Sequence, residues 1–199
     1  MSLRRRVAPV GTGDLYCRGL DMSARSKTKT FIVVLLVFVA GIVFSGVFNV
    51  GVSATNELEF CTSCHSMQIP YEEYKESAHF KNASGVQAIC SDCHVPKSFG
   101  PKMVAKVMAY KDVLHEFLGT IDTPEKYEEH RWAMANVVWD KMRKSGSREC
   151  RSCHEFEDMD LSEQDRMARK RHNSAVDEGQ SCIDCHKGVA HEEPDDPTI

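Results

Sequence analysis

The chain has 199 residues and a formal net charge of −4, enough for one modest domain beside any terminal segment. Charge is unevenly distributed: residues 1–30 carry seven basic and two acidic side chains, so the remainder has 18 basic and 27 acidic ones. Such acidity argues against a nucleic-acid partner and favours a protein partner with a basic patch.

The N-terminal region combines a basic segment with an apolar one. Residues 1–30 show no apolar period, so we expect them to be irregular. Residues 31–53 are uncharged and almost wholly apolar, which predicts one membrane-spanning helix in a lipid bilayer. A cleaved signal peptide is the alternative, because Val52-Ser53-Ala54 resembles a cleavage site, but signal peptides have apolar cores of only about 7–15 residues.

We therefore expect an uncleaved, single-pass anchor in the bacterial inner (cytoplasmic) membrane. By the positive-inside rule, the basic residues 1–30 lie in the cytoplasm and the domain of residues 54–199 lies in the periplasm.

Four Cys-x-x-Cys-His motifs follow the anchor, and they contain eight of the nine cysteines, leaving Cys17. This is the attachment sequence of c-type haem: the two thiols bond to the porphyrin, and the next histidine ligates the iron. A disulfide framework or zinc ribbons would explain the cysteine pairs but not four histidines in register. The sequence therefore predicts four covalent c-type haems on Cys61, Cys64, Cys90, Cys93, Cys150, Cys153, Cys182 and Cys185, with His65, His94, His154 and His186 as motif ligands.

The periplasmic domain shows an internal duplication, at about 57–100 and 147–194. Motifs one and three end in Ser-Cys-His, and motifs two and four end in Asp-Cys-His. Each half has a lone histidine shortly before its second motif, His79 and His172, and this repeated placement favours both as second iron ligands. His191 is a further candidate ligand, and Met67 is either a ligand or a packing residue. The roles of His115 and His130 stay open.

Three helices are expected, and no run of residues favours a strand. They are Lys102–Leu118, a helix capped by Thr123 that runs to Lys144, and a helix from Ser162 to Gly179. About 140 residues cannot cover four porphyrins and also build a separate core. We expect a mainly α fold, in which one transmembrane helix precedes a haem-packed multihaem cytochrome c domain.

The motifs together resemble the NapC/NirT family of membrane-bound tetrahaem quinol dehydrogenases, across residues 31–194. The resemblance is carried by Cys-x-x-Cys-His-x-Met just after the anchor and by several later segments, among them Ser77-Ala78-His79, Asp92-Cys93-His94-Val95-Pro96, Lys111-Asp112, Gly119-Thr120-Ile121-Asp122-Thr123-Pro124-Glu125 and His186-Lys187-Gly188-Val189-Ala190-His191. The NapC branch is the most similar, because the related NrfH lacks the segment that bears His172.

The resemblance implies that menaquinol or ubiquinol is oxidised beside the first haem, and that electrons pass to a periplasmic reductase, most simply a nitrate reductase. It further implies that Met67 replaces His65 as an iron ligand and that Asp112, with Lys106 as a looser match, forms the quinol site. Quinol oxidation needs proton acceptors, which a carboxylate can provide. The alternative for Asp112 is an exposed helix carboxylate.

We expect haems two to four to be ligated by pairs of histidines. Resemblance to NrfH implies His154 with His191 and His186 with His79, which leaves His172 for His94. Two other functions stay open: an electron-distributing hub for several periplasmic reductases or metal-reducing chains, and an enzyme that reduces a small substrate at an open haem. The number of spare ligands argues against the enzyme.

Overall fold

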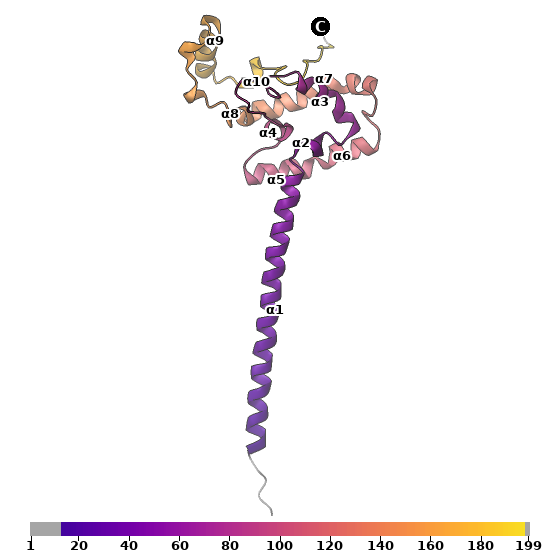
Figure 1. Ribbon diagram of the computed structural model, residues 1–199, viewed down its shortest axis with the longest axis vertical. Coiled ribbons are helices and arrows are strands. Elements are labelled where there is room, and N and C mark those ends of the chain that lie inside the picture. The colour runs from indigo at the N-terminus through magenta and orange to yellow at the C-terminus, as the bar shows by residue number, and fades with distance from the viewer. Residues whose placement is uncertain (1–12, 198–199) are drawn as a thin grey trace, which may run out of the picture. The chain divides into compact units, whose positions relative to one another are not determined.

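The computed structural model describes residues 13–197, and these residues contain helices and no strand (Figure 1). The expected mainly α fold is thereby confirmed for the described part of the chain. These residues form two compact units, which divide between Val52 and Ser53.

The first unit consists of helix α1 (Gly13–Ala54), whose segment Ser26–Ala54 is long and apolar enough to cross a membrane, with a mean hydropathy of 3.0. The helix begins earlier than the sequence suggested, since residues 13–30 were expected to be irregular. Leu, Met, Ala, Arg and Lys favour helix, and no proline interrupts the stretch. Residues 1–12 of the expected cytoplasmic segment lie outside the described residues.

The second unit is built from short helices around a few longer ones. In chain order they are α2 (Leu58–Cys61), the 3-10 turn η1 (His65–Met67), α3 (Gln68–Lys75), α4 (Cys90–His94), α5 (Phe99–Met108), α6 (Tyr110–Phe117), α7 (Pro124–Lys144), α8 (Arg148–Arg151), the 3-10 turns η2 (Phe156–Asp158) and η3 (Leu161–Glu163), α9 (Arg166–Asp177) and α10 (Cys182–Cys185).

The helix expected at Lys102–Leu118 is in fact two helices. α5 starts three residues early because Pro101 occupies its first turn, where a missing N–H costs no helical hydrogen bond. Ala109, with φ −62° and ψ −9°, remains in the right-handed helical region of backbone angles but separates α5 from α6. The two helices lie nearly end to end along one side of the unit (Figure 1).

The two later helices test the capping predictions. Thr123 caps α7 as expected, because its side chain accepts a hydrogen bond from the Lys126 N–H at 3.4 Å. The predicted start of the last helix at Ser162 was wrong. Asp165 is the cap of α9, since its carboxylate accepts from the N–H groups of Met167 and Ala168, at 2.8 and 3.0 Å.

Few apolar side chains are buried in the described residues: Tyr74, Tyr127, Trp139 and Ile183. The Tyr74 hydroxyl donates to the Ala88 carbonyl at 2.5 Å, and its ring meets Phe80 edge to face. A domain of this length with so small a side-chain core needs further apolar material. The four porphyrins predicted on eight cysteines would supply it.

A buried ion pair joins three parts of the second unit. Arg131 of α7 contacts Glu73 of α3 at 2.7 Å, and their side chains are 10% and 12% exposed. The Arg131 guanidinium also donates to the Glu192 carbonyl at 2.8 Å, and the Glu192 N–H donates to Glu73 at 3.0 Å. The C-terminal segment, including His191, is thus held against α3 and α7.

Candidate haem centres

The four motifs follow one another in space as they do in sequence. The thiols of Cys61 and Cys90 share a hydrogen bond, which lowers the pKa of Cys61 to about 7 and raises that of Cys90. Motifs two and three meet where α4 contacts α8. Motifs three and four meet where the Ser147 and Ser181 hydroxyls share a hydrogen bond of 2.5 Å. The attachment sites therefore form a row.

An aspartate shapes the two motifs that end in Asp-Cys-His. The Asp92 carboxylate accepts from the N–H of Ile89, the residue before the first cysteine, at 3.0 Å. Asp184 accepts in the same way from the N–H of Ser181, at 2.9 Å. Each carboxylate closes the first turn of a short helix, α4 or α10, which fixes the direction of the two cysteines. The repeated aspartate in the sequence was the signal for this shared geometry.

Six histidines lie in three pairs, each joining a motif histidine to a histidine outside the motifs. The distances between ring centres are 6.2 Å for His94 and His191, 6.1 Å for His154 and His79, and 5.8 Å for His186 and His172. Two imidazoles bound to opposite sides of one metal ion hold their ring centres about 6 Å apart, since metal–nitrogen bonds are about 2.0 Å long. The residues present therefore fit an iron ligated by two histidines at motifs two, three and four.

These pairs differ from those expected from the sequence, which joined His94 to His172, His154 to His191 and His186 to His79. The sequence predicted the same six histidines as ligands but joined them differently, because the pairing depends on how the segments between the motifs run. In the structure, α9 brings His172 to motif four of its own half. The C-terminal segment brings His191 back to motif two.

Hydrogen bonds fix the orientation of two of the outer histidines. His79 Nδ1 lies 3.2 Å from the Val189 carbonyl, and His172 Nδ1 lies 2.6 Å from the Gln164 side-chain oxygen. Both acceptors require a proton on Nδ1, which leaves the lone pair on Nε2 for a metal. The Nδ1 atom of His191 is buried without a hydrogen-bond partner in the described residues, and the nearest carboxylate oxygen, from Glu73, is 3.9 Å away.

The centre at His94 keeps its imidazoles neutral. The surrounding protein, with His191 and Lys141 close by, lowers the pKa of His94 to about 4, although part of its ring surface is accessible. Desolvation also lowers the pKa of His191. Neutral imidazole is the form that binds metals, so both side chains are ready to act as ligands at neutral pH.

Motif one is built differently from the other three. No other histidine ring pairs with His65 in the described part of the chain, and Met67 follows within the same 3-10 turn, 36% exposed. Glu116 of α6, which sequence reasoning missed, accepts hydrogen bonds from the His65 N–H at 3.1 Å and from the Ser66 hydroxyl. The signal for Glu116 was its position four residues after Asp112, on the same face of α6.

The two residues expected at the quinol site lie on consecutive helices. Lys106 of α5 donates to the carbonyl and the hydroxyl of Thr55, both at 2.7 Å, and its partial burial lowers its pKa. Asp112 of α6 is exposed and forms no hydrogen bond or ion pair among residues 13–197. Because Asp112 shares a helix face with Glu116, it lies on the side of α6 that meets motif one.

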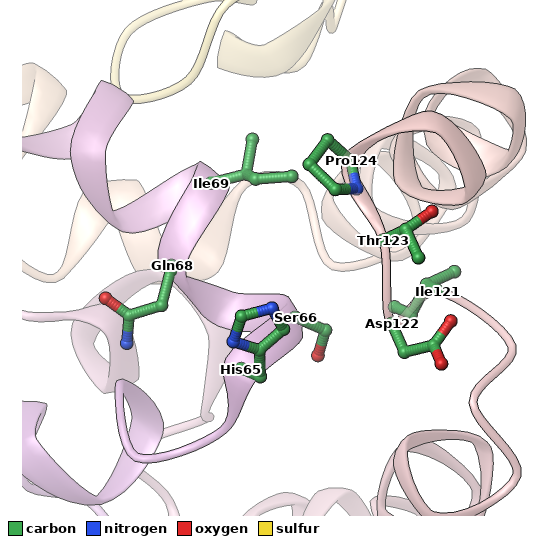
Figure 2. A pocket seen from close by; sticks show the side chains of 8 residues that line it. All are labelled: His65, Ser66, Gln68, Ile69, Ile121, Asp122, Thr123 and Pro124. Atoms are coloured by element: carbon green, nitrogen blue, oxygen red, sulfur yellow. The ribbon is translucent and has the colours of Figure 1, made fainter.

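A pocket of about 190 Å³ lies beside His65 (Figure 2). It lies between the turn after motif one and the loop before α7, and it is lined by His65, Ser66, Gln68, Ile69, Ile121, Asp122, Thr123 and Pro124. A cavity of this size holds a single ring rather than a porphyrin. Its carboxylate, Asp122, is paired with Lys126 at 2.7 Å, which lowers the pKa of Asp122 and makes it a poor proton acceptor.

Comparison with known proteins places the chain in a family. The sequence profile of the NapC/NirT cytochrome c family, N-terminal region, matches residues 23–196. The chain belongs to this family. It is thus a c-type tetrahaem electron-transport cytochrome.

Three relatives illustrate the family. A putative tetraheme cytochrome-c type protein of Allochromatium vinosum is 61% identical over 89% of this chain and 98% of its own length. The cytochrome c-type protein NapC of Escherichia coli K12 is 52% identical over 81% of each chain. The denitrification system component NirT of Stutzerimonas stutzeri is 48% identical over 83% of each. No solved structure matches the chain significantly.

Proposed function

We propose that this NapC/NirT-family cytochrome is held in the bacterial inner membrane by α1, oxidises quinol at the periplasmic surface and delivers electrons to a soluble periplasmic reductase. The observation that carries this proposal is the bond from Lys106 to Thr55. Thr55 is the first residue after α1, so α5 is fastened to the point where the chain leaves its apolar helix.

The surface beside that point suits contact with lipid and with quinol. α5 and α6 expose large apolar side chains among lysines, a composition typical of helices that lie in a membrane interface. The most exposed of them are Phe99, Val104, Val107, Tyr110, Phe117 and Leu118, each at least 58% exposed. A quinol ring, which is apolar with two polar oxygens, partitions to such a surface.

Within this region we assign Asp112 the role of proton acceptor. Each quinol releases two protons and two electrons, so a base has to lie near the oxidation site. Asp112 is the better candidate than Asp122, because Asp122 is already paired with Lys126. Lys106 positions α5 through Thr55, and Met67 stands beside His65 as the iron ligand that distinguishes motif one.

The four motifs lie in a row, which defines a route for the electrons. When bound, the haems supply reversible one-electron storage. The chain's residues order those groups: α2, α4, α8 and α10 contain six of the eight cysteines, and Cys64 and Cys153 lie in the turns after α2 and α8. The histidine pairs at motifs two to four offer two ligands each. Electrons then enter at motif one and leave at motif four.

A nitrate reductase is the partner we propose first, because the sequence resembles the NapC branch most. A second candidate role is an electron hub that serves several periplasmic reductases. The observation that favours the hub is the variety among the relatives, whose names separate NapC from a denitrification system component. Comparing electron delivery to purified nitrate and nitrite reductases distinguishes the two roles.

The test of the quinol site is Asp112→Asn in the full-length, membrane-bound cytochrome. The substitution preserves size and removes the base, so quinol-dependent haem reduction should slow by about 10²-fold or more, the usual contribution of a positioned base. Stopped-flow absorbance at the haem band measures this rate. Dithionite should still reduce all four haems.

The matched control is Asp122→Asn, which removes the carboxylate from the pocket beside His65 and should leave the quinol rate within about twofold. A normal rate in Asp112→Asn would contradict the proton-accepting role. Slow rates in Asp122→Asn alone would move the site to the pocket in Figure 2.

A further inference from the structure

Helix α9 carries a concentration of positive charge in a unit that is acidic as a whole. Four of its twelve residues are basic: Arg166, Arg169, Lys170 and Arg171. None of the four forms an ion pair with another described residue. Unpaired cations grouped on one helix repel one another, so their presence there is not explained by the stability of the fold.

The two faces of α9 have different surroundings. Its inner face carries His172, whose ring meets Phe156 edge to face and whose Nδ1 meets Gln164. The acidic segment before α9 therefore packs against this face. The opposite face exposes Arg166 and Lys170 in i, i+4 register, and beside them Met167, which is 65% exposed, in the same register with Arg171.

This outer face has the composition of a protein docking surface. Arginine and methionine are enriched in protein interfaces, and positive charges around an apolar contact steer a partner of opposite charge. The same helix supplies His172 to the pair with His186 at motif four, the last in the row. α9 lies at a corner of the unit away from α6 (Figure 1), so a protein bound there leaves the quinol surface free.

We propose that the outer face of α9 is the docking site for an acidic periplasmic redox protein, which receives electrons at the motif-four end. This inference rests on the proposed function. The bound partner is the oxidant and takes up one electron at a time, and quinol oxidation replaces the electrons that it removes. The net acidity of the chain after residue 30 led us to expect a basic partner. That net charge conceals the positive charge of α9, because acidic segments lie on either side of the helix.

Binding to two probe proteins of opposite charge tests the proposal with the full-length haem-loaded cytochrome. The acidic probe is a plant-type ferredoxin, and the basic probe is a mitochondrial-type cytochrome c. Their dissociation constants are measured by titration calorimetry at low and at physiological ionic strength. The variant Lys170→Glu/Arg171→Glu reverses the outer face of α9. The control Lys81→Glu/Lys144→Glu reverses two exposed lysines that form no ion pair in the described residues, so both variants lower net charge equally.

The α9 variant should bind ferredoxin at least about fivefold more weakly at low ionic strength, whereas the control should change by less than about twofold. Equal weakening in both variants, no weakening in either, or wild-type preference for the basic probe would each overturn the proposal. Lys170→Gln/Arg171→Gln provides a milder form of the test, since glutamine retains helix propensity.

Two further readouts separate this inference from the proposed function. An unchanged low-spin signal in the electron paramagnetic resonance spectrum of the α9 variant would show that His172 still ligates a haem iron. Quinol-dependent haem reduction should also stay normal, because it occurs at the other end of the row. If quinol does not reduce the haems of the wild-type protein, the proposed function is contradicted, whatever the probe binding shows.

Discussion

Arg131 shows how a single residue organises this small domain. Its guanidinium pairs with Glu73 in a largely buried setting and donates to the backbone of Glu192, one residue after His191. A buried ion pair adds little net stability compared with apolar residues of the same size, but removing one partner leaves the other charge buried alone. The role of the pair is positional, because it holds the segment that supplies His191.

We predict that Arg131→Met lowers the free energy of unfolding by about 3–5 kcal/mol, because Glu73 is left buried without a partner. Urea denaturation of the haem-loaded protein, followed by far-UV circular dichroism, measures the loss. The double variant Arg131→Met/Glu73→Met should recover most of it.

The control is Arg143→Met, because Arg143 is 38% exposed and bridges Asp140 and Asp184 near the surface. Its loss should cost about 0–1 kcal/mol. If Arg131→Met costs no more than this control, the buried pair does not hold the C-terminal segment.

At the scale of single residues, the sequence predicted candidate haem ligands but not how they pair in space. The cysteines and motif histidines are defined by spacing alone, and the outer histidines by their repeated placement. Their partners depend on contacts between distant segments, such as the ring pair of His94 and His191, which no local pattern encodes. Glu116 was missed because its one signal, a position four residues after Asp112, does not by itself show which segment that helix face contacts.

At the scale of elements, α9 has two tasks that depend on its first turn. It holds His172 on its inner face and basic side chains on its outer face, and Asp165 closes the N-terminal end with two hydrogen bonds. The sequence suggested Ser162 as the cap because serine followed by an acidic residue three positions later is a common helix start. Asp160 instead accepts from the Ser162 N–H and forms the turn η3, so the helix begins later.

We predict that Asp165→Ala destabilises α9 by about 1 kcal/mol, the usual effect of removing an N-cap. Hydrogen exchange of the backbone amides in α9 should then be about fivefold faster, since local opening becomes easier. Ser162→Ala is the control and should leave exchange in α9 nearly unchanged. If Ser162→Ala instead accelerates exchange in α9 more than Asp165→Ala does, Ser162 is the cap, as the sequence suggested.

At the scale of the whole molecule, composition anticipated most of the design. The apolar helix follows from the uncharged segment 31–53. The described residues contain no strand and few buried side chains, which agrees with a domain whose cysteines and histidines are predicted to bind four haems. The break at Ala109 was not predictable, because alanine favours helix and no local residue signals a stop there.

We predict that the mature protein carries four covalent haems and keeps its N-terminal helix. Intact-mass spectrometry of the protein extracted from membranes should show four haem additions and retain residues 1–50. Three additions would contradict the reading of one motif. A mass that corresponds to cleavage after Ala54 would identify α1 as a signal peptide.

The crossed histidine pairs also order events in time. His79 from the first half meets motif three, and His191 from the end of the chain meets motif two, while the Glu192 N–H reaches a carboxylate 119 positions earlier. The centre at motif two therefore cannot be completed until His191 has been synthesised, whereas the centre at motif four has both histidines within its own half. A haem bound early at motif two would have only His94 as a protein ligand until nearly the whole domain has followed.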